Sequence, residues 1–327
     1  MLKLKYLFDN PELAHMLLKN WDYDESSVDM FHSYRISANA VYPFTRNEKV
    51  HLLRFCPASE KIKDNLIAEL EFIAYLRNNQ YPALEAVPSK TGEELVQKMT
   101  PWGEYFASVF KRVNGTQLSD MPLENDLLFA YGSALGQLHK LSSKYTALVA
   151  ERWTHVEVLA WIKQILRNIS TEDAALQELE YLRVKFSQLP VNAENYGLIH
   201  YDFELDNIFY DPQAKSCNVI DFDDAMYHWY VMDIEQALDS LKGEVTESEF
   251  EQKKAYFLDG YKTQFAIDDE LFESRLLFRR FANLLGYARV TRAIQEKWEN
   301  EPDWLIQLRV KLNESLRRRS AYFGVQA

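Results

Sequence analysis

The order of strand-like and helical segments is the feature that most constrains the fold of this chain. One helical stretch over 62–78 lies among five β-rich runs in the first third, and Pro101 and Gly103 predict a hairpin between the last two runs. The five runs are VDMFHSYRI (28–36), NAVYPF (39–44), EKVHLLRF (48–55), EELVQKM (93–99) and YFASVFKRV (105–113). Strands followed by helices predict an α+β fold.

Beyond Asn114-Gly115 the pattern becomes helical. Apolar spacing predicts helices over 125–142, 154–169 and 172–187, and helices again from about 230 onward. Between them NIFYD and CNVIDF flank a turn-like PQAKS and predict a hairpin. We therefore expect a small five-stranded antiparallel N-terminal lobe, residues 1–110, and a larger, mostly helical C-terminal lobe, residues 111–327, with a cleft between them.

Composition limits the classes of partner. With 327 residues and 47% hydrophobic content, the chain can form two modest cores. A net charge of -12 argues against a nucleic-acid partner. Only two cysteines occur, the first residues do not resemble a signal peptide, and no apolar run reaches the roughly 20 residues of a membrane span. We expect a cytoplasmic protein that does not contact membranes.

The stretch 196–224, YGLIHYDFELDNIFYDPQAKSCNVIDFDD, carries most of the chemical information. Asp202 and Asn207 lie in a polar loop, and Asp221 ends the apolar run CNVI. The hairpin should return Asp221 close to Asn207, so that a carboxylate and an amide oxygen converge. A small number of oxygen ligands suits Mg²⁺, which completes its shell with water and phosphate.

Asp202 lies in the same loop without having to ligate the metal. That position suits a base that accepts the proton of an attacking hydroxyl while the metal neutralises phosphate charge. His200 is expected to brace the loop. Any one of these aspartates alone could be a turn residue or a helix cap, but the complete set is much harder to explain by chance.

HYDFELDN followed by NVIDFDD resembles the catalytic and metal-binding motifs of the aminoglycoside phosphotransferase and choline kinase-like family, distant relatives of the protein kinases. The resemblance covers most of the chain. It implies a protein-kinase-like bilobal fold with ATP between the lobes. By position, Asp202 would be the catalytic base, and Asn207 and Asp221 would be the Mg²⁺ ligands.

Other segments agree with the resemblance. HLLRF is similar to the family's third strand, which implies that Arg54 reaches the α- and β-phosphates. Glu69 would then orient this cation, although Glu71 competes for the role and a solvated helix face would also explain Glu69. Asp233 matches the family's buried aspartate, which caps the amides of the catalytic loop.

SVFKRVNG resembles the segment whose backbone groups hydrogen-bond adenine. Our estimate of that segment is Ser108, Val109 and Phe110. The following LGQLHKL resembles the next helix of the family, in which His139 is expected to be structural.

Three features depart from the family. The loop expected over the phosphates, SYRISANAVY at 33–42, contains no glycine. Position 204 is Glu, where protein kinases carry Lys, and it cannot screen a γ-phosphate. Asp223 and Asp224 follow Asp221, where protein kinases have a glycine.

The acceptor is expected to be small. Glu204, Asp206, Asp223 and Asp224 gather acidic charge, and aromatic residues lie nearby in sequence, so we expect an amine-bearing alcohol such as an amino sugar, a choline-like compound or a hydroxy amino acid. Surface charge and core packing would explain the same residues. The aromatic residues meant here are Tyr201, Tyr227, Trp229 and Tyr230.

Three functions fit the sequence. The first is an ATP-dependent small-molecule kinase acting as a monomer or homodimer. The second is a nucleotide-binding regulatory protein that no longer catalyses, and the third is a protein Ser/Thr kinase. The short segment between Asp221 and Asp233 leaves no obvious activation segment and disfavours the third.

Overall fold

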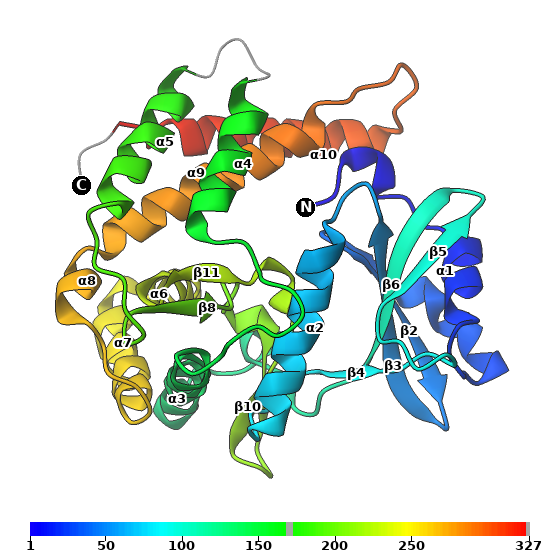
Figure 1. Cartoon of the computed structure of the whole chain (residues 1–327), viewed down its shortest axis with the longest axis horizontal. Coiled ribbons are helices and arrows are strands. Elements are labelled where there is room, and N and C mark those ends of the chain that lie inside the picture. Colours follow the sequence, from blue (N-terminus) through cyan, green and yellow to red (C-terminus); the bar gives the residue numbers. More distant parts are fainter. Residues whose placement is uncertain (168–172, 325–327) are drawn as a thin grey trace.

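The computed structural model describes residues 1–167 and 173–324, and the chain forms two unequal parts (Figure 1). An antiparallel sheet forms the smaller part, and helices form most of the larger one, with α2 between them. This is the expected α+β, protein-kinase-like architecture.

The N-terminal sheet has strand order β1-β2-β3-β6-β4, and β5 pairs with β6 beside β4. It therefore has six strands where five were expected, because the three-residue β4 is too short to give a periodic sequence signal. The strands are β1 (Arg35–Ile36), β2 (Ala40–Arg46), β3 (Lys49–Pro57), β4 (Glu85–Val87), β5 (Val96–Thr100) and β6 (Gly103–Lys111).

The first predicted strand, 28–36, is mostly a 3-10 helix. That helix covers Glu25–Ser33 and buries Ser27 and Phe31, which are four residues apart, so the burial has a helical period and not the alternation of a strand. Only Arg35–Ile36 pair with the sheet, as β1.

Helix α2 (Lys63–Asn78) matches the helix predicted over 62–78, and α1 (Pro11–Leu18) precedes the sheet in the chain. The apolar residues of α1 pack with the sheet in one core cluster. The apolar face of α2, from Leu70 to Leu76, instead joins a cluster built largely from the helical part. Helix α2 therefore ties the two parts together.

The helical part follows the predicted pattern closely. Residues 168–169 and 172, at the ends of two predicted helices, lie outside the described residues. Its helices are α3 (Asn125–Ser142), α4 (His155–Arg167), α5 (Asp173–Phe186), α6 (Val231–Glu244), α7 (Glu247–Lys262), α8 (Asp269–Glu273), α9 (Arg275–Ile294) and α10 (Asp303–Ser320).

Two small antiparallel sheets carry the motif region. The expected hairpin is formed by β9 (Ile208–Asp211) and β10 (Ser216–Val219), with β7 (Thr116–Gln117) on its edge. The second pair is β8 (Tyr196–Ile199) with β11 (Met226–Trp229). The loops between these strands bring together residues that the sequence separates.

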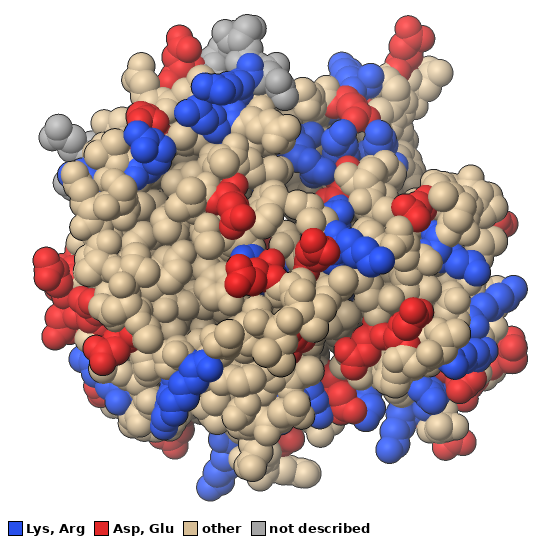
Figure 2. Space-filling model, in the orientation of Figure 1, with Lys and Arg blue, Asp and Glu red and all other residues tan. Residues whose placement is uncertain are grey.

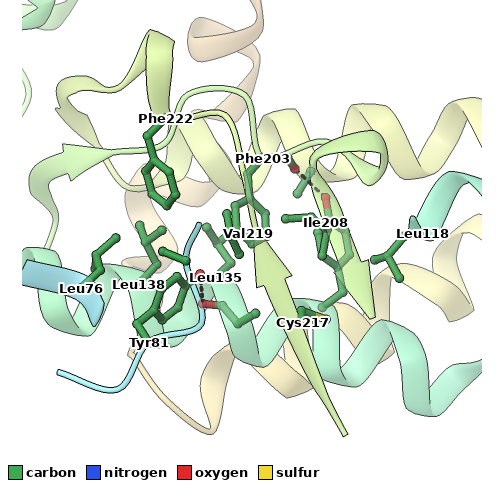
Figure 3. Close-up of a cluster of buried hydrophobic side chains, with 14 of the residues drawn as sticks. Leu76, Tyr81, Leu118, Leu135, Leu138, Phe203, Ile208, Cys217, Val219 and Phe222 are labelled. Carbon is green, nitrogen blue, oxygen red and sulfur yellow. Dashed lines mark hydrogen bonds between the residues drawn. The ribbon is translucent and has the colours of Figure 1, made fainter. Parts of the chain in front are cut away.

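The core beneath the hairpin fixes these loops. Figure 3 shows Val219 and Ile208 of the hairpin packed with Phe203 and with Leu135 of α3. The ring of Phe203 stacks on Tyr131 at 5.3 Å between centroids, and the Tyr131 hydroxyl donates a hydrogen bond to the Phe203 carbonyl. The loop around Asp202 is thus anchored in the core on both sides.

Charge is mixed on the face shown in Figure 2, where Lys and Arg are interspersed with Asp and Glu. Over residues 1–167 and 173–324, no helix is long and apolar enough to cross a bilayer.

Candidate active site

The loop between β8 and β9 is held by a buried carboxylate. Asp233 of α6 accepts hydrogen bonds from the backbone N–H of His200 at 2.8 Å and of Tyr201 at 2.6 Å. Tyr201 has a φ of 70°, a left-handed conformation that a bulky residue adopts only where its surroundings compensate. The two bonds to Asp233 provide that compensation, as expected for a capping aspartate.

Two buried histidines brace the same loop. The His200 Nδ1 accepts from the Asp202 N–H at 3.2 Å, so the Nε2–H donates to the Ile220 carbonyl at 2.9 Å. His139 lies 3.1 Å from Asp233 through Nε2. Burial lowers the pKa of both histidines, so both are neutral scaffold groups.

Asp202 and Asn207 are in direct contact. The Asn207 Nδ2 donates to the Asp202 carbonyl at 2.9 Å and to its Oδ2 at 3.0 Å. Because the amide nitrogen is used in this way, the Asn207 Oδ1 remains available as a ligand. Burial, and then the charge of Asp224, raise the pKa of Asp202 to about 6.

The hairpin brings Asp221 beside Asn207, as expected. The Ile220 N–H donates to the Asn207 carbonyl at 3.0 Å, and Val219 pairs with Ile208 in the strand register. Asp221 follows with a φ of 64°, the second strained residue of the site. The strained turn directs the chain away from β10 immediately after the strand ends.

The donor set around Asp221 fits a divalent cation. Burial, and then the charge of Asp223, raise the pKa of Asp221 to about 7, so a bound cation would relieve an unfavourable environment. The Asp223 Oδ1 is also buried without a hydrogen-bond partner among the described residues. No group of three His, Cys, Asp or Glu side chains suited to a metal occurs in that part of the chain, so water and phosphate would have to complete the coordination.

Arg54 and Glu69 form a bidentate ion pair. The Arg54 guanidinium of β3 donates to the two Glu69 carboxylate oxygens of α2 at 2.7 and 2.8 Å, and it lies 4.7 Å from the Phe110 ring centroid. Glu69 is fully buried. Glu71, the competing residue, instead accepts from backbone N–H groups in the loop at 148–150.

Ser108, Val109 and Phe110 lie inside β6. Ser108 pairs with Arg54 of β3, and Val109 pairs with β3 on one side and β4 on the other. The backbone leaves this pairing only at the end of β6, after Lys111. Free backbone groups therefore begin slightly later in the chain than the predicted segment.

Two ion pairs near the motif were not expected from the sequence. Lys61, in the loop between β3 and α2, pairs with Asp223, and Arg289 of α9 makes a bidentate contact with Asp224 at 2.7 and 2.8 Å. Each aspartate therefore has a cationic partner, which offsets much of the acidity that the sequence predicted for the site. Sequence separation hid these partners, because nothing local links positions 61 and 289 to 223 and 224.

A cleft of about 490 Å³ opens beside these pairs. Trp153, Trp161 and Gln164 from the α4 region line it on one side, and Arg289 and Arg292 of α9 line it on another. Ala38 of the glycine-free loop also reaches it. The cleft is large enough for a small organic molecule.

Two of the aromatic residues expected near the acceptor lie elsewhere, in the core. Trp229 is fully buried in the core of the helical part, and Tyr230 stacks on His139 at 4.5 Å between centroids. Core packing therefore explains these two residues. The indoles that do line the cleft, Trp153 and Trp161, carried no recognisable motif in the sequence.

The fold is protein-kinase-like, and the paired motifs lie in the loops of its hairpin region. The chain belongs to the phosphotransferase enzyme family, whose profile it matches over residues 37–265. The resemblance read from HYDFELDN and NVIDFDD is thus confirmed.

One curated relative is a kinase by name. Amicoumacin kinase of Bacillus subtilis (strain 168) is 24% identical over 205 residues, which cover 60% of this chain. The chain spans 58% of the length of that curated relative.

Two solved structures share the fold. An amicoumacin kinase in complex with AMP-PNP, Ca²⁺ and Ami has a TM-score of 0.76 at 19% identity, covering 97% of this chain and 95% of the other. A microcompartment-associated aminopropanol kinase has a TM-score of 0.68 at 19% identity, covering 97% and 99%.

Proposed function

We propose that this chain is an ATP-dependent kinase that phosphorylates a hydroxyl group of a small molecule. The observation that carries the proposal is the convergence of Asp202, Asn207 and Asp221 across from the Arg54–Glu69 pair. Each of these groups has a part in phosphoryl transfer, and binding a nucleotide without catalysis would not require a base at Asp202.

Arg54 contacts the α- and β-phosphates, and Glu69 holds its guanidinium in place. Adenine binds the free backbone groups that follow β6, just after the predicted segment Ser108–Phe110, whose backbone is paired within the sheet. Mg²⁺ held by Asp221 and the Asn207 Oδ1 would neutralise phosphate charge during transfer.

The acceptor hydroxyl lies against Asp202. Its oxygen bonds to the γ-phosphorus as the bond from that phosphorus to the β–γ bridging oxygen breaks, and the hydroxyl proton passes to the Asp202 carboxylate. The products are ADP and a phosphate monoester. The raised pKa of Asp202, about 6, suits a base that works near neutral pH.

The acceptor we propose carries an amine. Two indoles, Trp153 and Trp161, line the cleft, and tryptophan is the best aromatic partner for a cation. Glu204 adds a partly buried acidic group beside Asp202. The names of the relatives, amicoumacin kinase and aminopropanol kinase, agree with this class of acceptor.

A cytoplasmic location is part of the same proposal. Cys56 and Cys217 are both buried free thiols, which agrees with a reducing compartment.

The test is coupled ADP release over amino sugars, amino alcohols and hydroxy amino acids. We expect acceptor-dependent ADP release from the unaltered chain and a loss of about 10²–10⁴-fold in Asp202→Asn, with ATP affinity retained. Asp206→Asn, in the same loop, is the matched control. Equal turnover by Asp202→Asn would remove Asp202 from its role.

A catalytically silent nucleotide-binding protein is the second candidate. Glu204 and the glycine-free loop at 33–42 favour it. This candidate predicts that ATP with Mg²⁺ raises the melting temperature while no acceptor in the panel yields ADP.

A further inference from the structure

One partly buried arginine beside the catalytic loop lacks a carboxylate partner. Five other arginines of α9 and α10 each donate to a carboxylate at 2.6–2.7 Å, and Arg275 lies 4.0 Å from Glu235. These pairs are Arg279–Glu235, Arg280–Glu178, Arg289–Asp224, Arg292–Glu60 and Arg309–Glu301. Arg319 forms no ion pair with any described residue.

The contacts of Arg319 are weak. Its Nη1 lies 3.4 Å from the carbonyl and from the Oδ1 of Asn283, and its Nε is buried without a partner in the described chain. A buried guanidinium is normally paired, because desolvating an unpaired charge is unfavourable. The arrangement therefore leaves room for an anion from outside the chain.

A glycine makes space for this guanidinium. At Gly286 of α9, an added Cβ would lie 2.5 Å from the Arg319 Cζ and Nη1. Gly286 is one helical turn from Arg289, which lines the 490 Å³ cleft. The Arg319 head group consequently lies against the backbone of the helix that forms one wall of this cleft.

Tyr201 links Arg319 to the reaction centre. Burial raises the pKa of Tyr201, and the charges of Arg289 and Arg319 oppose that rise. Arg289 lies 5.3 Å from the Tyr201 ring centroid. No hydrogen bond engages the Tyr201 hydroxyl within the described residues, and Asp202 is the next residue.

We propose that Arg319, with the Tyr201 hydroxyl, binds a carboxylate on the acceptor, and that the acceptor is therefore a hydroxy amino acid or a compound containing that unit. The inference rests on the proposed kinase function and narrows the class of acceptor. With the amine and carboxylate of the α-carbon held in this way, the side-chain hydroxyl at the other end of the acceptor would point toward Asp202. A guanidinium and a phenol together suit the planar geometry of a carboxylate.

The test compares acceptors that differ only in the carboxylate. The pairs are serine with ethanolamine, homoserine with aminopropanol, and threonine with isopropanolamine. We expect at least one carboxylated member to have the higher kcat/KM. Arg319→Gln should lower kcat/KM for the carboxylated member by roughly 10- to 100-fold, mainly by raising its KM. It should change kcat/KM for the matching amine by less than about twofold.

Arg318→Gln, at the exposed neighbouring position, is the matched control and should leave both values unchanged. For each pair, the ratio of kcat/KM between the carboxylated member and its amine is measured on one protein preparation. A smaller amount of folded Arg319→Gln protein lowers both values equally, so it cannot change this ratio. Calorimetric binding of the six compounds to the chain with ADP and Mg²⁺ gives a readout that does not depend on turnover.

Three results would overturn the inference. These are a preference for the amines over their carboxylated partners, an equal loss for both members in Arg319→Gln, and no binding of any carboxylated member. Phosphorylation of the amines alone would reject this inference and leave the kinase function standing. No ADP release with any acceptor would instead reject the kinase function.

Discussion

Asp202 combines the two properties that a general base needs at the residue scale. It is positioned by a donated hydrogen bond from Asn207, and its pKa is raised to about 6 by burial and by the charge of Asp224. The carboxylate is therefore deprotonated at neutral pH and still basic enough to take a proton.

The pH dependence follows from that pKa. Because the base must be deprotonated, kcat/KM should rise about tenfold per pH unit up to pH 6 and level off above it. Asp206→Asn should move the midpoint downward, since the charge of Asp206 helps to raise this pKa. A rate that does not change between pH 5 and pH 8 would contradict the assignment.

The Arg54–Glu69 pair gives a stability prediction. Its side chains are 12% and 0% exposed, so Arg54→Met leaves a buried carboxylate without its partner and should lower the unfolding free energy by about 3–5 kcal/mol. Replacing both residues by Met should recover most of the lost unfolding free energy. Urea unfolding of the two single variants and the double variant measures it, and additive losses would show that the two residues do not act as a pair.

At the element scale, α3 and α7 pack backbone against backbone. An added Cβ at Gly132 of α3 would lie 1.8 Å from the Phe257 carbonyl oxygen of α7, and one at Gly260 would lie 2.0 Å from that of Phe129. This contact holds α3, whose Tyr131 anchors the catalytic loop through Phe203.

Gly132→Ala should therefore separate the two helices and destabilise the fold by about 3 kcal/mol or more. Gly243→Ala is the matched control, because nothing lies within 4 Å of an added Cβ there and alanine favours the helix. Thermal unfolding of both variants checks the difference. Equal melting temperatures would mean that α3 and α7 can move apart freely.

The sequence predicts the elements of this fold better than it predicts their contacts. Helix α3 was predicted over its full range because Leu127, Tyr131, Leu135 and Leu138 keep a helical period. Residues 28–33 were misread as a strand because the few apolar residues there define no clear period, and β4 was missed because three residues carry no period.

The same limit applies to the site. The motif residues at 202, 207 and 221 were found because they are close in sequence and on a hairpin. Lys61 and Arg289 reach the site through tertiary packing, which no local pattern records. The acidity expected from Asp223 and Asp224 is largely offset for that reason.

At the scale of the whole molecule, the two parts are joined by charge and by a shared core. Lys61 pairs with Asp223, and Glu60 of the same loop pairs with Arg292 of α9 at 2.7 Å. The apolar face of α2 packs into the core of the helical part. The lobe division predicted at residue 110, next to the end of β6, is consequently bridged at several points.

Acid should weaken the larger part first. Burial lowers the pKa of His155 to about 4, and that of His228, against the same tryptophan, also falls well below its usual value. Since the unfolded chain binds these protons at about pH 6.5, stability is complete above that pH and declines as the pH falls toward 4.

The decline should be about 1.4 kcal/mol per pH unit for each of the two histidines below pH 6.5. Unfolding free energies measured by urea between pH 7 and pH 5 test this, with His155→Phe expected to flatten the dependence. Because the raised pKa values of Asp202 and Asp221 act in the opposite direction over this range, the difference between the two proteins is the readout. An identical pH dependence in His155→Phe would show that His155 is solvated in the folded protein.

The most direct test of the kinase assignment is phosphorus NMR of the chain with ATP, Mg²⁺ and the acceptor panel. The geometry around Asp202 predicts a new phosphate monoester signal that grows in step with ADP, and no such signal with Asp202→Asn. Formation of ADP with inorganic phosphate alone, or the same monoester from both proteins, would contradict it.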